Sequence, residues 1–277
     1  MTQKLLSLYG LKWNPFSTDV PTSALYTPPA VDCFAQRLEQ QVRDGGFALI
    51  SGAPGTGKST TLRRLAHRLE ALPDLVVGVL TRPQSRLADF YRELGDLFAV
   101  PLQPHNRWAG FKALRETWSR HLQSTLWRPT LIVDEAQEMQ GEVLAELRLL
   151  ASTDFDSKSV LTVVLAGDER LLERLRQREL LPIASRVRAR LHLEAQTPQE
   201  MAEFLDHALE QAGCPQLITP SLRSLLCEHA GGNYRTLSHL GDELLAAAAQ
   251  RQAPELDDQL FFELLAPARK KPRRAGA

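Results

Sequence analysis

The hydrophobic positions of this chain follow two patterns, one up to about residue 197 and another beyond it. In the first part, short apolar runs rich in β-branched residues alternate with segments whose apolar residues recur every three or four positions. Such runs are typical of buried strands in a parallel sheet, and they are FALIS (47–51), LVVGVL (75–80), TLIVDE (130–135) and VLTVVLAG (160–167). Strands and helices that alternate in this way predict an α/β core built from βαβ units.

The segments between these runs have the spacing of helices. Leu62, Leu65, Ala66 and Leu69 recur at the positions of one helix face. Similar patterns cover about 85–98, 108–125 and 141–151.

Beyond residue 197 only helical patterns occur. Thr197 is expected to cap a helix, with Pro198 at the first helical position and Glu200 completing a capping box. Two further helical patterns cover 221–230 and 234–250. We therefore expect four regions: an N-terminal segment with a first helix (1–45), an α/β domain (46–196), an all-helical domain (197–265) and a disordered basic tail (266–277).

Composition adds few constraints on function. With 277 residues, 43% hydrophobic and 24% charged, the chain has the composition of a globular protein, and 33 basic against 33 acidic residues predict neither nucleic-acid binding nor its absence. Three cysteines in no metal-ligand spacing favour a reduced compartment. The N-terminus does not resemble a secretory signal, and no apolar run is long enough to span a bilayer. We expect a cytoplasmic protein that does not contact a membrane.

The stretch GAPGTGKST (52–60) lies between the first apolar run and a helical pattern. It has the spacing of a phosphate-binding loop, whose backbone N–H groups wrap phosphates and whose glycines avoid side-chain clashes. The following helix adds the positive end of its dipole. Lys58 is expected to contact the β- and γ-phosphates and Ser59 to bind Mg²⁺; the alternative is an ordinary glycine-rich turn. The expected ATP-binding residues here are Gly52, Ala53, Pro54, Gly55, Thr56, Gly57, Lys58, Ser59 and Thr60.

The run LIVDEAQ (131–137) places two acidic residues at the end of a buried strand. A carboxylate there costs desolvation free energy unless a cation compensates it. Asp134 is therefore expected to hold Mg²⁺ and Glu135 to orient the attacking water, which predicts an ATPase. The alternative role for this acidic pair is a helix N-cap.

Three further residues each have two possible roles. Asp168 ends the run VLTVVLAGD, where it could help to position water or cap the next helix. Arg186 in SRVRAR (185–190) could stabilise phosphoryl charge in a neighbouring subunit, or the alternating arginines could form one exposed face of an edge strand. Arg235 in GGNYRTL (231–237) could reach the γ-phosphate from the helical domain, or it could mark only the start of a helix.

These five elements, in this order, resemble the AAA+ ATPases over nearly the whole chain. The resemblance implies a parallel-sheet P-loop core with a helical lid domain. It also implies roles for named residues: DEAQ as the Walker B motif, Asp168 as sensor 1, Arg186 as the arginine finger and Arg235 as sensor 2.

A narrower resemblance is to the general-secretion ATPase A (ExeA) family, and it rests on LYGLKWNPFS, GFALISGAPGTGKST, IVDEAQEM, ELRLLAS, VVLAGDERL and GGNYRTLSHL. In that family the segment before the first strand helps to wall the adenine, which implies Pro15, Phe16 and Tyr26 as adenine contacts here. The module is also similar to the helper ATPases of DNA transposons, of the TnsC, TniB, MuB and IstB type.

The sequence departs from the secretion branch after the lid. Secretion members carry a transmembrane segment and a peptidoglycan-binding domain there, whereas this chain has the tail RKKPRRAGA (269–277), so we expect a mobile-element ATPase. Asp168 also stands where many close relatives carry Gln, which makes its sensor role less certain than that of the other motifs.

The leading hypothesis is a regulator of DNA transposition that oligomerises around double-stranded DNA with ATP, recruits a transposase and is released on hydrolysis. The DNA contact would ignore base sequence, and its candidate residues are Arg63, Arg64, Arg148, Arg269, Lys270, Lys271, Arg273 and Arg274. For each of them the alternative is a solvated surface position. The competing hypotheses are a soluble ATPase for secretion or envelope assembly and a nucleotide-switched signalling or defence protein.

Overall fold

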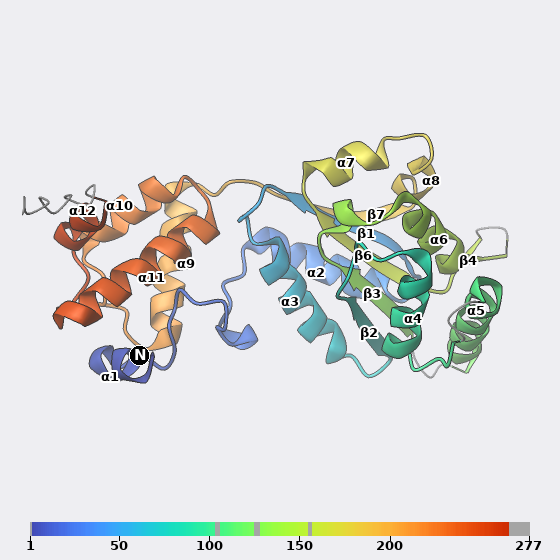
Figure 1. Cartoon of the computed structure of the whole chain (residues 1–277), viewed down its shortest axis with the longest axis horizontal. Helices are drawn as coiled ribbons and strands as arrows, with labels where there is room; N and C mark the ends of the chain where they lie inside the picture. Colours follow the sequence, from blue (N-terminus) through green and yellow to red (C-terminus); the bar gives the residue numbers. More distant parts are fainter. Residues whose placement is uncertain (1, 103–105, 125–127, 155–156, 266–277) are drawn as a thin grey trace, which may run out of the picture. The chain divides into compact units, whose positions relative to one another are not determined.

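A computed structural model describes residues 2–102, 106–124, 128–154 and 157–265 of the chain (Figure 1). The chain divides into two compact units. One unit comprises residues 27–195, and the other joins residues up to 26 with those from 196 onwards.

The first unit is built on a five-stranded sheet in which all neighbouring strands are parallel. The strand order across the sheet is β2-β3-β6-β1-β7. The strands are β1 (Gly46–Gly52), β2 (Leu75–Leu80), β3 (Arg128–Val133), β6 (Thr162–Gly167) and β7 (Val187–Leu193). The four predicted strands are confirmed, and β7 adds an edge strand from the segment that contains the alternating arginines.

Helices cover both faces of this sheet (Figure 1). On one face lie α2 (Pro29–Gln41) and α3 (Lys58–Glu70). On the other lie α4 (Leu87–Leu97), α5 (Arg107–Gln123), α6 (Gly141–Ala151), α7 (Glu169–Leu175) and α8 (Leu181–Ala184). A short antiparallel pair, β4 (Ser152–Thr153) and β5 (Lys158–Ser159), follows α6.

The strand sequences explain why the sheet needs two helical layers. Successive strand residues point to opposite faces, so a strand that is apolar throughout has two faces to bury. In β1, Phe47 and Leu49 pack into the core on the α4–α8 side, whereas Ala48 and Ile50 pack against α2 and α3. The predicted α/β P-loop fold with a parallel sheet is therefore confirmed.

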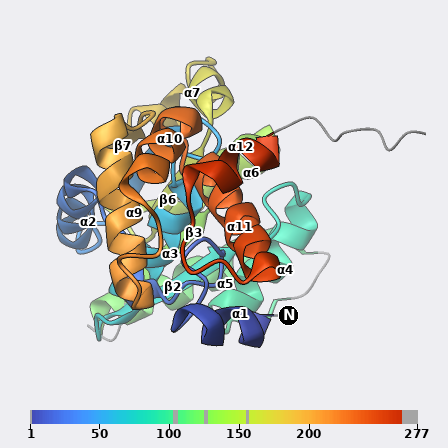
Figure 2. The same ribbon diagram turned by 90° about the vertical axis from the view of Figure 1, so that its left-hand side faces the viewer.

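The second unit is all-helical (Figure 2). Its elements are α1 (Thr2–Tyr9), the short 3₁₀ helix η1 (Thr22–Ala24), α9 (Pro198–Ala212), α10 (Pro220–Ala230), α11 (Tyr234–Arg251) and α12 (Asp258–Leu265). The capping box predicted at the start of α9 is present, with Thr197 and Glu200 exchanging hydrogen bonds. The backbone and side-chain donors of Thr197 lower the pKa of the Glu200 carboxyl.

The N-terminal stretch expected as one region (1–45) is divided between the two units. Tyr9, Leu11 and Phe16 are buried in the core of the helical unit, where the Phe16 ring lies so close to Gly241 that a Cβ there would be 2.5 Å from it. In contrast, α2 packs on the sheet through Phe34 and Leu38. The first 26 residues thus belong to the helical unit because their apolar side chains complete its core.

The basic tail (266–277) lies outside the described residues. Among the helices that the structure describes, none has the length and apolar character that crossing a membrane requires.

Candidate active site

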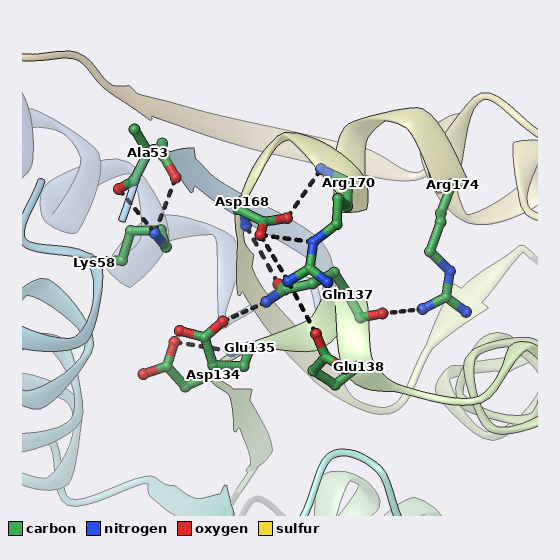
Figure 3. Close-up of polar contacts among 10 residues, drawn as sticks. Ala53, Lys58, Asp134, Glu135, Gln137, Glu138, Asp168, Arg170 and Arg174 are labelled. Carbon is green, nitrogen blue, oxygen red and sulfur yellow. Dashed lines mark hydrogen bonds and ion pairs between the residues drawn. The ribbon is translucent and has the colours of Figure 1, made fainter. Parts of the chain in front are cut away.

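Three strand ends bring the predicted site residues together. The strands β3, β6 and β1 are neighbours and run parallel, so their carboxyl ends meet at one edge of the sheet. The phosphate-binding loop follows β1, Asp134 and Glu135 follow β3, and Asp168 follows β6 (Figure 3).

The loop after β1 has the backbone geometry of a phosphate cradle. Gly55 and Gly57 have φ values of 85° and 96°, in the left-handed region that glycine adopts without a side-chain penalty. A Cβ at Gly52 would collide with the carbonyl oxygen of Leu193 and would lie 2.8 Å from the Thr56 hydroxyl. The Thr56 hydroxyl itself donates to the carbonyl of Ala53, which ties the loop to itself. Each of these glycines is therefore required by the fold of the loop.

Lys58 starts α3 directly after the loop and is only 6% exposed. Its ammonium group donates to the carbonyl oxygens of Gly52 and Ala53, at 2.9 and 3.1 Å, and pairs with no carboxylate among the described residues (Figure 3). A buried cation with only neutral partners is costly to desolvate and attracts an anion. Ser59 and Thr60, in the first turn of α3, are exposed beside it. The loop therefore fits a nucleoside triphosphate.

Asp134 and Glu135 form the turn by which the chain leaves the sheet after β3. Glu135 has a φ of 51°, a left-handed conformation that is uncommon for residues other than glycine. One carboxylate oxygen of Asp134 accepts the backbone N–H of Glu135 at 2.9 Å. Glu135, rather than Asp134, precedes the 3₁₀ helix η2 (Ala136–Glu138), and its side chain makes no capping bond. This tight turn leaves Glu135 exposed and Asp134 partly buried.

Asp168 caps the helix that follows β6. Its carboxylate accepts from the backbone N–H and from the Nε of Arg170, both at 2.9 Å. Arg170 also pairs with Glu138 at 2.9 Å, and its hydrogen bond with Asp168 raises the pKa of the guanidinium. Of the two roles considered for Asp168, the structure shows the helix cap; the sensor role stays a prediction.

Gln137 was not identified from the sequence, yet it connects the two acidic strand ends. Its side-chain amide donates to one carboxylate oxygen of Glu135, and its carbonyl accepts the backbone N–H of Asp168 at 3.3 Å (Figure 3). The side chain is 6% exposed. The sequence shows that Gln137 lies two residues after Glu135. It does not show the contact with Asp168 after β6, because that contact depends on how the chain turns after β3.

The arginines of SRVRAR fall into two groups. Arg188 and Arg190 are exposed on β7, while Ala189 and Leu191 between them are buried. The alternative of an exposed arginine face on an edge strand is therefore confirmed for these two. Arg186 lies before the strand, where its guanidinium donates to the carbonyl of Pro182 in α8. Its role as an arginine finger stays a prediction.

The remaining candidates for nucleotide contact belong to the helical unit. Arg235 is the second residue of α11, after the N-cap Asn233. Pro15 and Phe16 are buried there, and the ring of Tyr26 lies against Phe204 and His207 with centroid distances of 5.9 and 5.6 Å. Their parts in ATP binding stay predictions.

The metal and DNA predictions also remain open. In residues 2–102, 106–124, 128–154 and 157–265, no group of three or more His, Cys, Asp or Glu side chains could hold a metal by itself. Mg²⁺ held by Ser59 and Asp134 would instead take its other ligands from phosphate and water, as this ion commonly does. Arg63, Arg64 and Arg148 are partly buried, and the tail candidates lie outside the described residues.

We expect Lys58→Ala to lose nucleotide binding, because it removes the one cation that the loop encloses. The loss should be about 100-fold or more, the size expected for charge-assisted hydrogen bonds. Titration with a fluorescent ATP analogue measures it, and Lys112→Ala, at an exposed position of α5, is the matched control. An unchanged affinity of Lys58→Ala contradicts the loop assignment.

Comparison with known proteins supports the fold and the activity. The protein family described as "AAA domain" matches residues 40–175. General secretion pathway protein A of Aeromonas hydrophila is 33% identical over 248 residues, which cover 88% of this chain and 44% of that protein. The chain therefore spans less than half the length of this relative.

Solved structures of two Aeropyrum pernix ORC proteins are similar in fold. The Aeropyrum pernix ORC2 protein in ADPNP–ADP complexes superposes with a TM-score of 0.68 at 17% identity, covering 90% of this chain and 70% of that one. The Aeropyrum pernix ORC1 protein in complex with DNA gives 0.67 at 16% identity, covering 90% and 67%. With the buried Lys58, the cradle of glycines and the acidic end of β3, these similarities show that the chain has a P-loop fold in which residues 40–175 form an AAA domain.

Proposed function

We propose that Lys58, Ser59, Asp134 and Glu135 perform the ATPase reaction at the carboxyl edge of the sheet. The observation that carries this proposal is the buried Lys58 ammonium group, which has only carbonyl partners and follows β1, two strands away in the sheet from β3 and the two carboxylates at its end. Lys58 and the loop N–H groups bind the β- and γ-phosphates. Mg²⁺, held by Ser59 and Asp134, supplies further neutralisation of phosphate charge when it is bound.

Glu135 orients the attacking water in this proposal. Its carboxylate is exposed, so water reaches it, and the left-handed turn fixes the direction in which the side chain leaves the sheet. A carboxylate in this position accepts a hydrogen bond from water and aligns it with the phosphorus atom.

We expect Glu135→Gln to bind ATP as the wild type does and to hydrolyse it roughly 100-fold more slowly or worse, because the carboxamide keeps the shape but polarises water weakly. Steady-state phosphate release measures turnover, and Glu142→Gln, the same change at an exposed position of α6, is the control. Turnover at the wild-type rate in Glu135→Gln contradicts the role of Glu135.

The ATPase is proposed to work as a homo-oligomer. Arg186 directly precedes β7, which is an edge strand of the sheet. A guanidinium at such an edge can reach the phosphates bound by the next subunit, where its fixed charge stabilises the transition state. The resemblance to AAA+ ATPases assigns the finger role to this residue.

We expect Arg186→Ala to bind ATP but to lose hydrolysis, and a mixture of Arg186→Ala with Lys58→Ala to regain part of it. The mixture regains activity because the first variant keeps a loaded site and the second supplies the missing arginine. Arg82→Ala, an exposed arginine beyond the opposite edge strand β2, should behave as wild type. Failure of the mixture, with co-assembly shown by sedimentation, indicates instead that Arg186 acts within its own subunit.

Two proposals concern what the hydrolysis drives. The 33% identity with general secretion pathway protein A favours an ATPase for secretion or envelope assembly. The second candidate is the transposition regulator, which assembles on double-stranded DNA and recruits a transposase. It is supported by the resemblance to transposon helper ATPases and by the fold likeness to the Aeropyrum pernix ORC1 protein, which was solved in complex with DNA.

Binding to duplex DNA separates the two candidates. A chain with a formal charge of zero should hold duplex weakly as a monomer, and an ATP-bound oligomer should hold it more tightly because its basic residues act together. We therefore expect binding that requires ATPγS, ignores sequence and weakens with salt by a slope of about −0.9 per phosphate neutralised. Fluorescence anisotropy over a salt series measures this, with Lys58→Ala as control. An absence of binding in every nucleotide state favours the secretion candidate.

A further inference from the structure

The side chain of Gln137 is bonded at both of its ends (Figure 3). Its Nε2 donates to Oε2 of Glu135, and its Oε1 accepts from the backbone N–H of Asp168. The side chain is 94% buried, whereas the Glu135 carboxylate that it contacts is exposed. The buried amide can therefore hold the Glu135 carboxylate from the protein side, while the solvent side of the carboxylate stays accessible.

The surrounding structure fixes Gln137 in this place. The guanidinium of Arg174 in α7 donates to the backbone carbonyl of Gln137, and Arg170 in the same helix pairs with Glu138. These contacts fasten η2 to α7 on both sides of the Gln137 side chain. Gly167 provides the space, because a Cβ there would lie 2.5 Å from the Gln137 Oε1.

The contact leaves one oxygen of Glu135 for catalysis. The backbone of Glu135 is already fixed by its left-handed turn, so the remaining freedom of the residue is the rotation of its side chain. Gln137 takes Oε2, and Figure 3 shows the other oxygen on the side of Lys58. Restricting a reactive group to its productive rotamers increases the rate without changing how substrate binds.

We propose that Gln137 is a positioning residue for ATP hydrolysis, which holds the Glu135 carboxylate in a fixed position relative to Asp168 at the end of β6. The proposal rests on the role of Glu135 as the residue that orients water. Gln137 acts through Glu135 and does not contact the phosphate-binding loop in the described residues, so its effect falls on kcat and not on KM.

Two substitutions test the two ends of the side chain. Gln137→Met keeps the length and loses both hydrogen bonds. Gln137→Glu keeps an acceptor for the Asp168 N–H but removes the donor and places a second negative charge beside Glu135. Both should lower kcat by roughly 10- to 100-fold, the range expected for a hydrogen bond to a charged group, and leave KM and the Kd for Mg-ATPγS within about twofold. Gln140→Met, the same change at an exposed position before α6, should match the wild type.

A double variant separates positioning from a structural role. Adding Gln137→Met to Glu135→Gln should cause no further loss of turnover, since the residue through which Gln137 acts is already disabled. The free protein gives a second readout by NMR. The side-chain amide of Gln137, assigned by its absence in Gln137→Met, should change its ¹H and ¹⁵N shifts in Glu135→Ala.

The outcomes distinguish this proposal from the one it rests on. Wild-type turnover in both Gln137 variants, with Glu135→Gln inactive, overturns the positioning role alone. Wild-type turnover in Glu135→Gln overturns both. A fall in nucleotide affinity and thermal stability together with kcat in Gln137→Met shows a structural role and also overturns the proposal.

Discussion

The buried ammonium of Lys58 is the constraint around which the candidate site is built. A cation that is 6% exposed and bonded only to carbonyl groups loses hydration without gaining an opposite charge. Two acidic groups at the same edge of the sheet, Asp134 and Glu135, follow β3, which is two strands away from β1. They form no ion pair with Lys58 in the described residues. The site therefore holds opposite charges apart, and the magnesium-bound triphosphate that we propose as its ligand would satisfy both.

The parallel sheet determines where these charges meet. With the order β3-β6-β1, the strand ends that carry the loop, the acidic pair and Asp168 come to one edge, although they are far apart in the sequence. Antiparallel pairing of any two of these strands would send one of the groups to the opposite edge. The apolar composition of β1, β3 and β6 is thus a requirement of the chemistry as well as of the core.

The elements set by local sequence could be predicted, and those set by long-range packing could not. The strands, the phosphate loop and the Thr197 capping box follow from spacing and residue type within a few positions. The position of Phe16 depends on Gly241, which is distant in the sequence and whose missing side chain leaves space for the Phe16 ring. Gln137 was missed for the same reason, because its partner at Asp168 is brought to it by the pairing of β3 with β6. Sequence periodicity carries no information on either contact.

Charge balance at the strand ends explains why a neutral residue occupies position 137. Glu135, Glu138 and Asp168 all lie there, and like charges at close range repel one another. Arg170 pairs with both Asp168 and Glu138, so in the proposed reaction Glu135 is the acidic group that meets water. An arginine or lysine at 137 would place a positive charge against the Glu135 carboxylate. A neutral amide can bond to Glu135 and to the Asp168 backbone at once, so it joins the two strand ends without adding a charge beside Glu135.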